Sequence, residues 1–75
     1  MIKTLVCDDH AMVRESLPLA LEVDSDINIV GTARNTAEAL GVAASSGIDV
    51  ALVDLHLGDE SGLSLISALK DVLPL

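Results

Sequence analysis

The chain has 75 residues, a length that allows one small domain or part of a larger one. Its formal net charge is −8 and its four basic residues are scattered, so we expect no nucleic-acid contact by this segment, because phosphate contacts need a basic patch. The apolar share is 51%, yet Phe, Tyr and Trp are absent, so the core must be aliphatic.

The opening sequence and the single cysteine bear on where the chain resides. The opening MIKTLVCDDH lacks the character of a signal peptide, since its apolar run is short and acids follow at once. No apolar stretch reaches the roughly 18–20 residues needed to cross a bilayer. Cys7 lies in an apolar run without a second cysteine to pair with, so we interpret it as a small core residue. These features predict a cytoplasmic protein without membrane contact.

The first two predicted elements are a strand and a helix. Residues 2–7 form a short, partly β-branched apolar run bounded by acids, which is typical of a buried strand. Residues 11–23 have helical periodicity with one apolar face. That face consists of Val13, Leu17, Ala20 and Leu21. Pro18 lies within the pattern and costs about 3 kcal/mol inside a helix, so we expect a kink or a late helix start.

The next two predicted elements are again a strand and a helix. Residues 27–30 alternate like a short strand, which Gly31 should end. Residues 35–38 (NTAE) resemble a capping box, with a Glu three positions after the capping side chain. A second helix should follow through about Ser45, where Gly47 stops it.

The last predicted elements complete a regular alternation. Residues 50–53 form a third apolar strand, a loop runs from Gly58 to Gly62, and residues 63–73 form a third helix. Strands that alternate with helices of this length imply a parallel sheet with right-handed crossovers. The first and third strands are continuous apolar runs, which predicts that both of their faces are covered.

Three acids follow two of the predicted strands. Asp8 and Asp9 end the first strand, and Asp54 ends the third. Functional groups in an open parallel sheet gather beyond the carboxyl ends of the strands, so a 2-1-3 strand order would bring these carboxylates into one crevice. Like charges at such distances repel, so either their pKa values rise or a cation lies among them. Oxygen ligands in an open site favour Mg²⁺ or a similar hard ion.

The two histidines do not indicate a zinc site. His10 and His56 lack metal-ligand spacing with Cys7. We interpret each histidine as a solvated residue in a loop or at the start of a helix.

Several stretches resemble one protein family. Residues 6–10 (VCDDH) and 12–17 (MVRESL) resemble the start of bacterial response-regulator receiver domains, above all those of the LuxR/NarL type, which carry a DNA-binding helix-turn-helix domain farther along. Residues 54–57 (DLHL), with Gly62 eight positions after Asp54, resemble the phosphoacceptor strand end and loop. Residues 29–33 (IVGTA) also fit. The resemblance spans the whole chain and implies an α/β, flavodoxin-like (CheY-like) three-layer fold with a parallel sheet of order 2-1-3.

The resemblance implies roles for individual residues. Asp54 would accept a phosphoryl group from a phosphohistidine of a sensor histidine kinase. Asp9 and Asp54 would ligate Mg²⁺ directly, Asp8 would act mainly through water, and the backbone carbonyl of His56 would complete the protein ligands. A carboxylate is a weak nucleophile towards a charged phosphoryl group, so a metal that cancels repulsion and orients both partners supplies most of the catalysis.

The chain departs from the family pattern in two ways. It has Leu57-Gly58 where the family commonly has Met-Pro, and Gly58 should loosen a loop that Pro would stiffen, without loss of the site. The family's fourth and fifth strands, with a hydroxyl residue and a lysine that bind the phosphoryl group, do not fall within residues 1–75, nor does an effector domain. Lys70 is no substitute for that lysine. We therefore interpret residues 1–75 as a partial receiver domain.

This organisation predicts association between copies of the chain. In a 2-1-3 order the third strand lies at the edge of the sheet, and an exposed apolar edge strand is a template for pairing. We expect a homodimer or a strand-exchanged oligomer.

Two other functions compete with phosphoryl acceptance. The first is a non-phosphorylated structural or dimerisation fragment, in which the acids are a remnant or a solvated rim. The second is a Mg²⁺-dependent phosphohydrolase, which also places Asp at the ends of parallel strands, but position 56 is His where such an enzyme has a second acid. The leading interpretation is a signalling domain that is no enzyme beyond phosphotransfer to its own Asp54.

Overall fold

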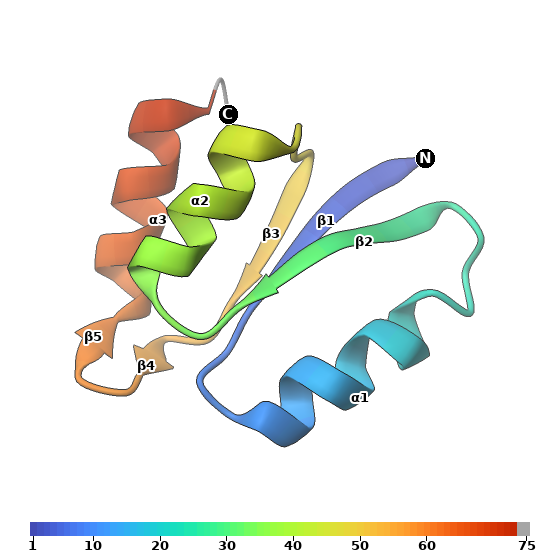
Figure 1. Ribbon diagram of the computed structural model, residues 1–75, viewed down its shortest axis with the longest axis horizontal. Coiled ribbons are helices and arrows are strands. Elements are labelled where there is room, and N and C mark those ends of the chain that lie inside the picture. Colours follow the sequence, from blue (N-terminus) through green and yellow to red (C-terminus); the bar gives the residue numbers. More distant parts are fainter. Residues whose placement is uncertain (74–75) are drawn as a thin grey trace.

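The computed structural model describes residues 1–73, which form a three-layer α/β fold (Figure 1). In chain order the elements are β1 (Ile2–Cys7), α1 (Ala11–Leu21), β2 (Ile27–Ala33), α2 (Thr36–Ser45), β3 (Val50–Val53), β4 (His56–Leu57), β5 (Glu60–Ser61) and α3 (Gly62–Val72). Strands β2, β1 and β3 form a parallel sheet in that order. Helix α1 lies on one side of the sheet, and α2 and α3 lie on the other. The predicted fold class and the 2-1-3 strand order are confirmed.

The hydrophobic core lies between the sheet and the pair α2 and α3. Leu5 and Cys7 of β1 are buried there together with Ala33 of β2. Helix α2 contributes small residues, Ala39 and Ala43, which let its backbone approach the sheet closely. The remaining buried members are Leu57, Leu65 and Leu69. The aliphatic core predicted from composition is confirmed, and Cys7 is one of its members.

Helix α1 covers its face of the sheet incompletely. Within the described chain it has no buried residue; Val13, Leu17 and Leu21 are half-buried and Ala20 is exposed. The helix begins at Ala11 and continues through Pro18 to Leu21, so the late start proposed from Pro18 is wrong. Proline removes one N–H donor, yet its own carbonyl accepts a 2.9 Å hydrogen bond from Glu22, which keeps the last turn intact.

Strand β3 is covered on one face only. Its alternate residues Ala51 and Val53 pack against the core, whereas Val50 and Leu52, on the side of α1, remain 43% and 40% exposed. The prediction that both faces of this strand are covered is therefore wrong for the described residues. A continuous apolar sequence indicates that both faces of a strand can be buried, but it does not show that a neighbouring layer covers each face.

Strand β2 is longer than its sequence indicates. Gly31 does not end it: the pairing shifts register between Thr4 and Leu5, so that Ile29 faces Thr4 and Gly31 faces Leu5. The shift leaves Val30 without a partner, as in a β-bulge, and the strand then continues to Ala33. This extension matters for the site because Ala33 accepts a 2.9 Å hydrogen bond from the backbone N–H of Asp8.

Helix α2 agrees with its capping signature. The Asn35 side chain accepts a 2.9 Å hydrogen bond from the backbone N–H of Glu38, and the Glu38 carboxylate accepts one of 3.0 Å from the backbone N–H of Arg34. The helix ends at Ser45, as predicted. None of the helices described for residues 1–73 is both long and apolar enough to span a membrane.

The predicted loop from Gly58 to Gly62 forms part of a small hairpin that begins at His56. His56 pairs with Ser61 and Leu57 pairs with Glu60 in an antiparallel arrangement. Glu60 also accepts a 2.8 Å hydrogen bond from the backbone N–H of Thr36, at the start of α2. The hairpin is thereby attached to the α2 side of the fold.

Leu65 and Leu63 of α3 provide a matched test of the core. Leu65 is fully buried and Leu63 is 66% exposed. We expect Leu65→Ala to lower the free energy of unfolding by about 2–5 kcal/mol, because it leaves a cavity, and Leu63→Ala to change it by less than about 0.5 kcal/mol. Urea titration followed by circular dichroism measures both values, and equal effects would contradict the placement of the core.

Cys7 allows a test by pH. Burial raises the pKa of its thiol from 9.0 to about 11. The folded chain then keeps the neutral thiol while the unfolded chain ionises, so the free energy of unfolding should fall as pH rises from about 9 to about 11. The difference between wild type and Cys7→Ala isolates this contribution, and iodoacetamide should modify Cys7 at neutral pH only after unfolding. Rapid modification of the folded chain would show that the thiol is not buried.

Candidate metal centre

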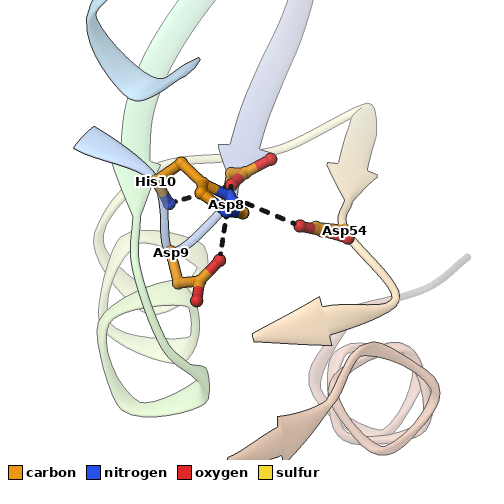
Figure 2. Close-up of side chains that lie close together, drawn as sticks. All are labelled: Asp8, Asp9, His10 and Asp54. Atoms are coloured by element: carbon orange, nitrogen blue, oxygen red, sulfur yellow. Dashed lines mark hydrogen bonds and ion pairs between the residues drawn. The ribbon is translucent and has the colours of Figure 1, made fainter. Parts of the chain in front are cut away.

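The pairing of β1 with β3 brings the predicted acids together. Cys7 and Val53 are register partners, so the residues that follow them emerge side by side at the carboxyl edge of the sheet. The backbone N–H of Asp54 donates a 2.9 Å hydrogen bond to the carbonyl of Cys7, which continues the ladder by one step. Figure 2 shows Asp8, Asp9 and Asp54 converging on one point, together with His10.

The four side chains are close enough to share one ligand. Each offers one donor atom, and these four atoms lie within 4.8 Å of one another. The Nδ1 atom of His10 lies 2.7 Å from Oδ1 of Asp8, 3.1 Å from Oδ1 of Asp9 and 3.9 Å from Oδ2 of Asp54. The structure thus assembles Asp8, Asp9 and Asp54 as the sequence predicted, and adds His10.

The cluster is open to solvent. The side chains of Asp8, Asp54 and Asp9 are 16%, 28% and 32% exposed, whereas that of His10 is 68% exposed. An open cavity of about 590 Å³ adjoins the cluster, and the apolar side chains Val6, Val13, Leu17 and Leu52 form part of its lining. A hydrated cation can therefore reach the carboxylates without rearrangement of the core.

The electrostatics of the cluster favour a charged Asp8 carboxylate and a charged His10 imidazole. Burial acts to raise the pKa of Asp8, but hydrogen bonds from the backbone and ring of His10, with the charges of His10 and Arg14, outweigh it and lower that pKa. The hydrogen bond to Asp8, followed by the negative charges of Asp9 and Asp8, raises the pKa of His10. Among residues 1–73, no Lys or Arg side chain forms an ion pair with the three carboxylates.

This set of donors fits a hard divalent cation. Three carboxylates in a partly solvated crevice offer the oxygen ligands that Mg²⁺ and Ca²⁺ prefer, and the openness leaves room for bound water. A cation there also removes the mutual repulsion of the carboxylates.

His56, the remaining residue predicted for the site, lies in β4. Its backbone N–H donates a 3.2 Å hydrogen bond to Oδ1 of Asp54, which holds one oxygen of that carboxylate. Its side chain is exposed. A role for its carbonyl as a metal ligand stays a prediction.

Gly58 is a site residue that sequence reasoning misread. Its backbone N–H donates a 2.9 Å hydrogen bond to Oδ2 of Asp9, and its φ angle is +61°. Proline could supply neither, because it lacks the N–H and fixes φ near −65°. The glycine therefore does more than loosen the loop: it lets the hairpin hold an acid that lies far away in sequence. The signal available in the sequence was a glycine at a position where the family commonly has proline, which fixes φ.

Gly62 closes the same segment. A Cβ atom at this position would collide with the carbonyl oxygen of Asp54, and the Gly62 N–H donates a 2.9 Å hydrogen bond to the carbonyl of Leu55. The glycine eight positions after Asp54, noted in the sequence, is thus required by a backbone-to-backbone contact.

His10 was interpreted as a solvated residue in a loop or at the start of a helix, and the structure confirms a solvated helix start but adds contacts with the acids. It is the N-cap residue of α1 and is well exposed, but its side chain makes no capping hydrogen bond. The ring instead turns towards the acids. Its contacts with Asp8 and Asp9 are local in the sequence, whereas its approach to Asp54 depends on the pairing of β1 with β3.

Comparison with known proteins agrees with the fold and identifies the family. Residues 4–74 match the family described as the response regulator receiver domain. The transcriptional regulatory protein YdfI of Bacillus subtilis is 38% identical over 71 residues, which are 95% of this chain and 33% of that protein. The DNA-binding transcriptional activator DevR/DosR of Mycobacterium tuberculosis is 35% identical over 74 residues, which are 99% of this chain and 34% of that protein.

A solved structure gives the same result. A response regulator protein from Burkholderia pseudomallei, crystallised with a phosphorylated aspartic acid, calcium ion and citrate, is 37% identical with a TM-score of 0.84. The likeness covers 99% of this chain and 42% of that one. This chain also spans only about a third of the length of the two curated relatives above.

The parallel sheet and its acid pocket define a doubly wound α/β domain with a functional edge at its strand ends. The match over residues 4–74 is more specific: the chain belongs to the response regulator receiver domain family. The resemblance noted in the sequence is confirmed, including its likeness to regulators of transcription.

Two substitutions separate the contributions of Gly58. Gly58→Ala keeps the N–H that holds Asp9 but places a side chain at φ +61°, so we expect a loss of about 1–2 kcal/mol in stability with Mg²⁺ affinity changed little. Gly58→Pro also removes the donor, and loss of such a partner of a metal ligand typically costs about 10–100-fold in affinity. Calorimetric titration with Mg²⁺ measures this difference. Equal affinity in both variants would show that the hydrogen bond to Asp9 is dispensable.

Proposed function

We propose that this chain is the phosphoacceptor part of a two-component response regulator, in which Asp54 takes a phosphoryl group from a phosphohistidine of a sensor histidine kinase. The observation that carries the proposal is the position of Asp54: a partly exposed carboxylate whose oxygen lies in one 4.8 Å cluster with donor atoms of Asp8 and Asp9. The proposal is supported by membership of the receiver family and by the phosphorylated aspartic acid named for the Burkholderia protein.

The chemistry requires one bond to form and one to break. A carboxylate oxygen of Asp54 attacks phosphorus, the P–N bond of the phosphohistidine breaks, and the electron pair returns to the imidazole of the kinase. The His56 N–H holds Oδ1 of Asp54, and Oδ2 faces the cluster. Preorganisation of this kind spares the nucleophile a reorganisation step.

The cation that we propose for this reaction is Mg²⁺. Asp9 and Asp54 would hold it directly, Asp8 would act mainly through water, and the carbonyl of His56 would be the further protein ligand. When bound, it cancels repulsion between the carboxylates and the incoming phosphoryl group. The protein's own part is to hold Asp9 from the hairpin, through the 2.9 Å hydrogen bond of Gly58.

The setting of the module is also part of the proposal. The relatives named above are regulators of transcription, which supports a role in the cytoplasm. In this proposal a helix-turn-helix domain, separate from residues 1–75, makes the contact with DNA. The net charge of −8 supports the absence of direct DNA contact by this segment.

A structural or dimerisation role is the second candidate, and the β3 edge favours it. Strand β3 pairs only with β1 among the described residues, and Val50 and Leu52 on it are substantially exposed. Such an edge favours pairing with a second copy. Sedimentation of the chain at micromolar concentration measures whether it is a homodimer, and urea titration measures whether it unfolds cooperatively. A monomer that unfolds cooperatively would count against this role.

Phosphorylation of Asp54 can be tested directly. With Mg²⁺ and acetyl phosphate, we expect intact-mass spectrometry to show one added phosphoryl group on the wild-type chain and none on Asp54→Asn, which lacks the nucleophile. Asp59→Asn, in the exposed tip of the hairpin, removes an acid outside the cluster and should be labelled like wild type. An unlabelled wild type, or label that persists on Asp54→Asn, would overturn the proposal.

A further inference from the structure

We propose that the imidazole of His10 is a nitrogen ligand of the cation held by Asp9 and Asp54, so that the site prefers nitrogen-seeking divalent metals relative to Mg²⁺ more strongly than oxygen ligands alone would. The inference rests on the metal site of the proposed function but not on phosphorylation of Asp54. The side chains that the inference involves all belong to the cluster of Asp8, Asp9, His10 and Asp54.

The distances match a coordination sphere. Around an octahedral ion with bonds of about 2.1 Å, adjacent donor atoms are about 3.0 Å apart and opposite donors about 4.2 Å apart. Nδ1 of His10 lies 3.1 Å from Oδ1 of Asp9, an adjacent-donor distance, and 3.9 Å from Oδ2 of Asp54, which lies between the adjacent and opposite distances. These two distances are compatible with a nitrogen ligand beside Asp9 and Asp54.

The backbone holds the ring in place. The His10 N–H donates a 2.9 Å hydrogen bond to Oδ1 of Asp8, and the His10 carbonyl accepts 3.1 Å hydrogen bonds from the N–H groups of Val13 and Arg14 in the first turn of α1. The residue is therefore held from both sides, by β1 and by α1. Figure 2 shows its side chain directed towards the acids.

Ligation requires Nδ1 to lose a proton. In the metal-free chain Nδ1 donates a 2.7 Å hydrogen bond to the Asp8 carboxylate, so a bound cation would displace that proton to solvent, and Nε2 would keep the other one. The side chain is 68% exposed, so water can hydrogen-bond to that group. The hydrogen bond that Nδ1 shares with Asp8 would be replaced by the bond to the metal, and Asp8 would keep the backbone N–H of His10 as a partner.

A nitrogen donor changes which cations bind best. Carboxylates, carbonyls and water suit Mg²⁺ and Ca²⁺, whereas imidazole suits Co²⁺, Ni²⁺ and Zn²⁺. Loss of an outer partner of a metal ligand costs about 10–100-fold in affinity, so loss of the ligand itself should cost at least as much. His10→Ala should therefore lower the ratio of Co²⁺ to Mg²⁺ affinity by at least about tenfold.

The experiment uses Co²⁺ and Mg²⁺ as probes. Calorimetric titration of wild type, His10→Ala and His10→Gln gives the affinity ratio. In addition, ¹H NMR of the Co²⁺-loaded chain in D₂O reports a non-exchangeable imidazole C–H signal shifted far from its usual position when a histidine is bound to the metal. This signal should persist in His56→Ala, which lacks the other imidazole, and vanish in His10→Ala.

Each outcome decides the inference. A tenfold or greater fall in the ratio, with loss of the shifted signal in His10→Ala, supports it. An unchanged ratio, a gain in affinity for both metals, or no shifted signal in wild type overturns it, since the ring would then only compete with the cation for the carboxylates. If His10→Ala does not fold, the signal in His56→Ala decides alone. Failure of Asp54 labelling with an intact His10 signal would refute the proposed phosphotransfer and leave this inference standing.

Discussion

The rest of the site depends on the parallel pairing of β1 with β3. The register that joins Cys7 to Val53 makes the ends of two strands coincide, and each strand ends in acid. Without that register, the carboxylates would be ordinary surface charges. With it, the fold concentrates negative charge at one edge of the sheet, and hydrogen bonds or a cation must compensate that charge. The aliphatic core beneath the sheet stabilises this arrangement, because the same β1 residues that precede the acids are fully buried.

The protein compensates the charge with one backbone N–H for each acid. His10 donates to Asp8, His56 donates to Asp54, and Gly58 donates to Asp9. The first two contacts are local, two residues apart, whereas the third joins the end of β1 to the hairpin after β3. Each bond holds one oxygen of a carboxylate, so the three acids are orientated by the backbone around them.

The sheet and the three acids could be predicted from the sequence, whereas other features of the site and the fold could be identified only in the structure. Alternating strands and helices, together with acids after two of the strands, were enough for the sheet and for Asp8, Asp9 and Asp54, because these depend on local pattern. The role of Gly58, and the approach of His10 to Asp54, depend on which loops meet in space, which no local spacing encodes. The bulge in β2 was missed because Gly31 was interpreted as a strand end although it pairs with Leu5, and the two-residue strands of the hairpin were missed because the glycines around them indicated a loop. The uncovered face of β3 was missed because an apolar run does not reveal its neighbours.

The contact of Gly62 with the Asp54 carbonyl has a mechanical meaning. The chain leaves β3 at Asp54, makes the hairpin excursion, and returns to touch its starting point as α3 begins (Figure 1). The hairpin segment is therefore closed by a backbone contact between Asp54 and Gly62, where there is no space for even a methyl group. The start of α3 therefore packs directly on the backbone that carries Asp54, so the position of the helix and the position of that carboxylate are set by the same contact.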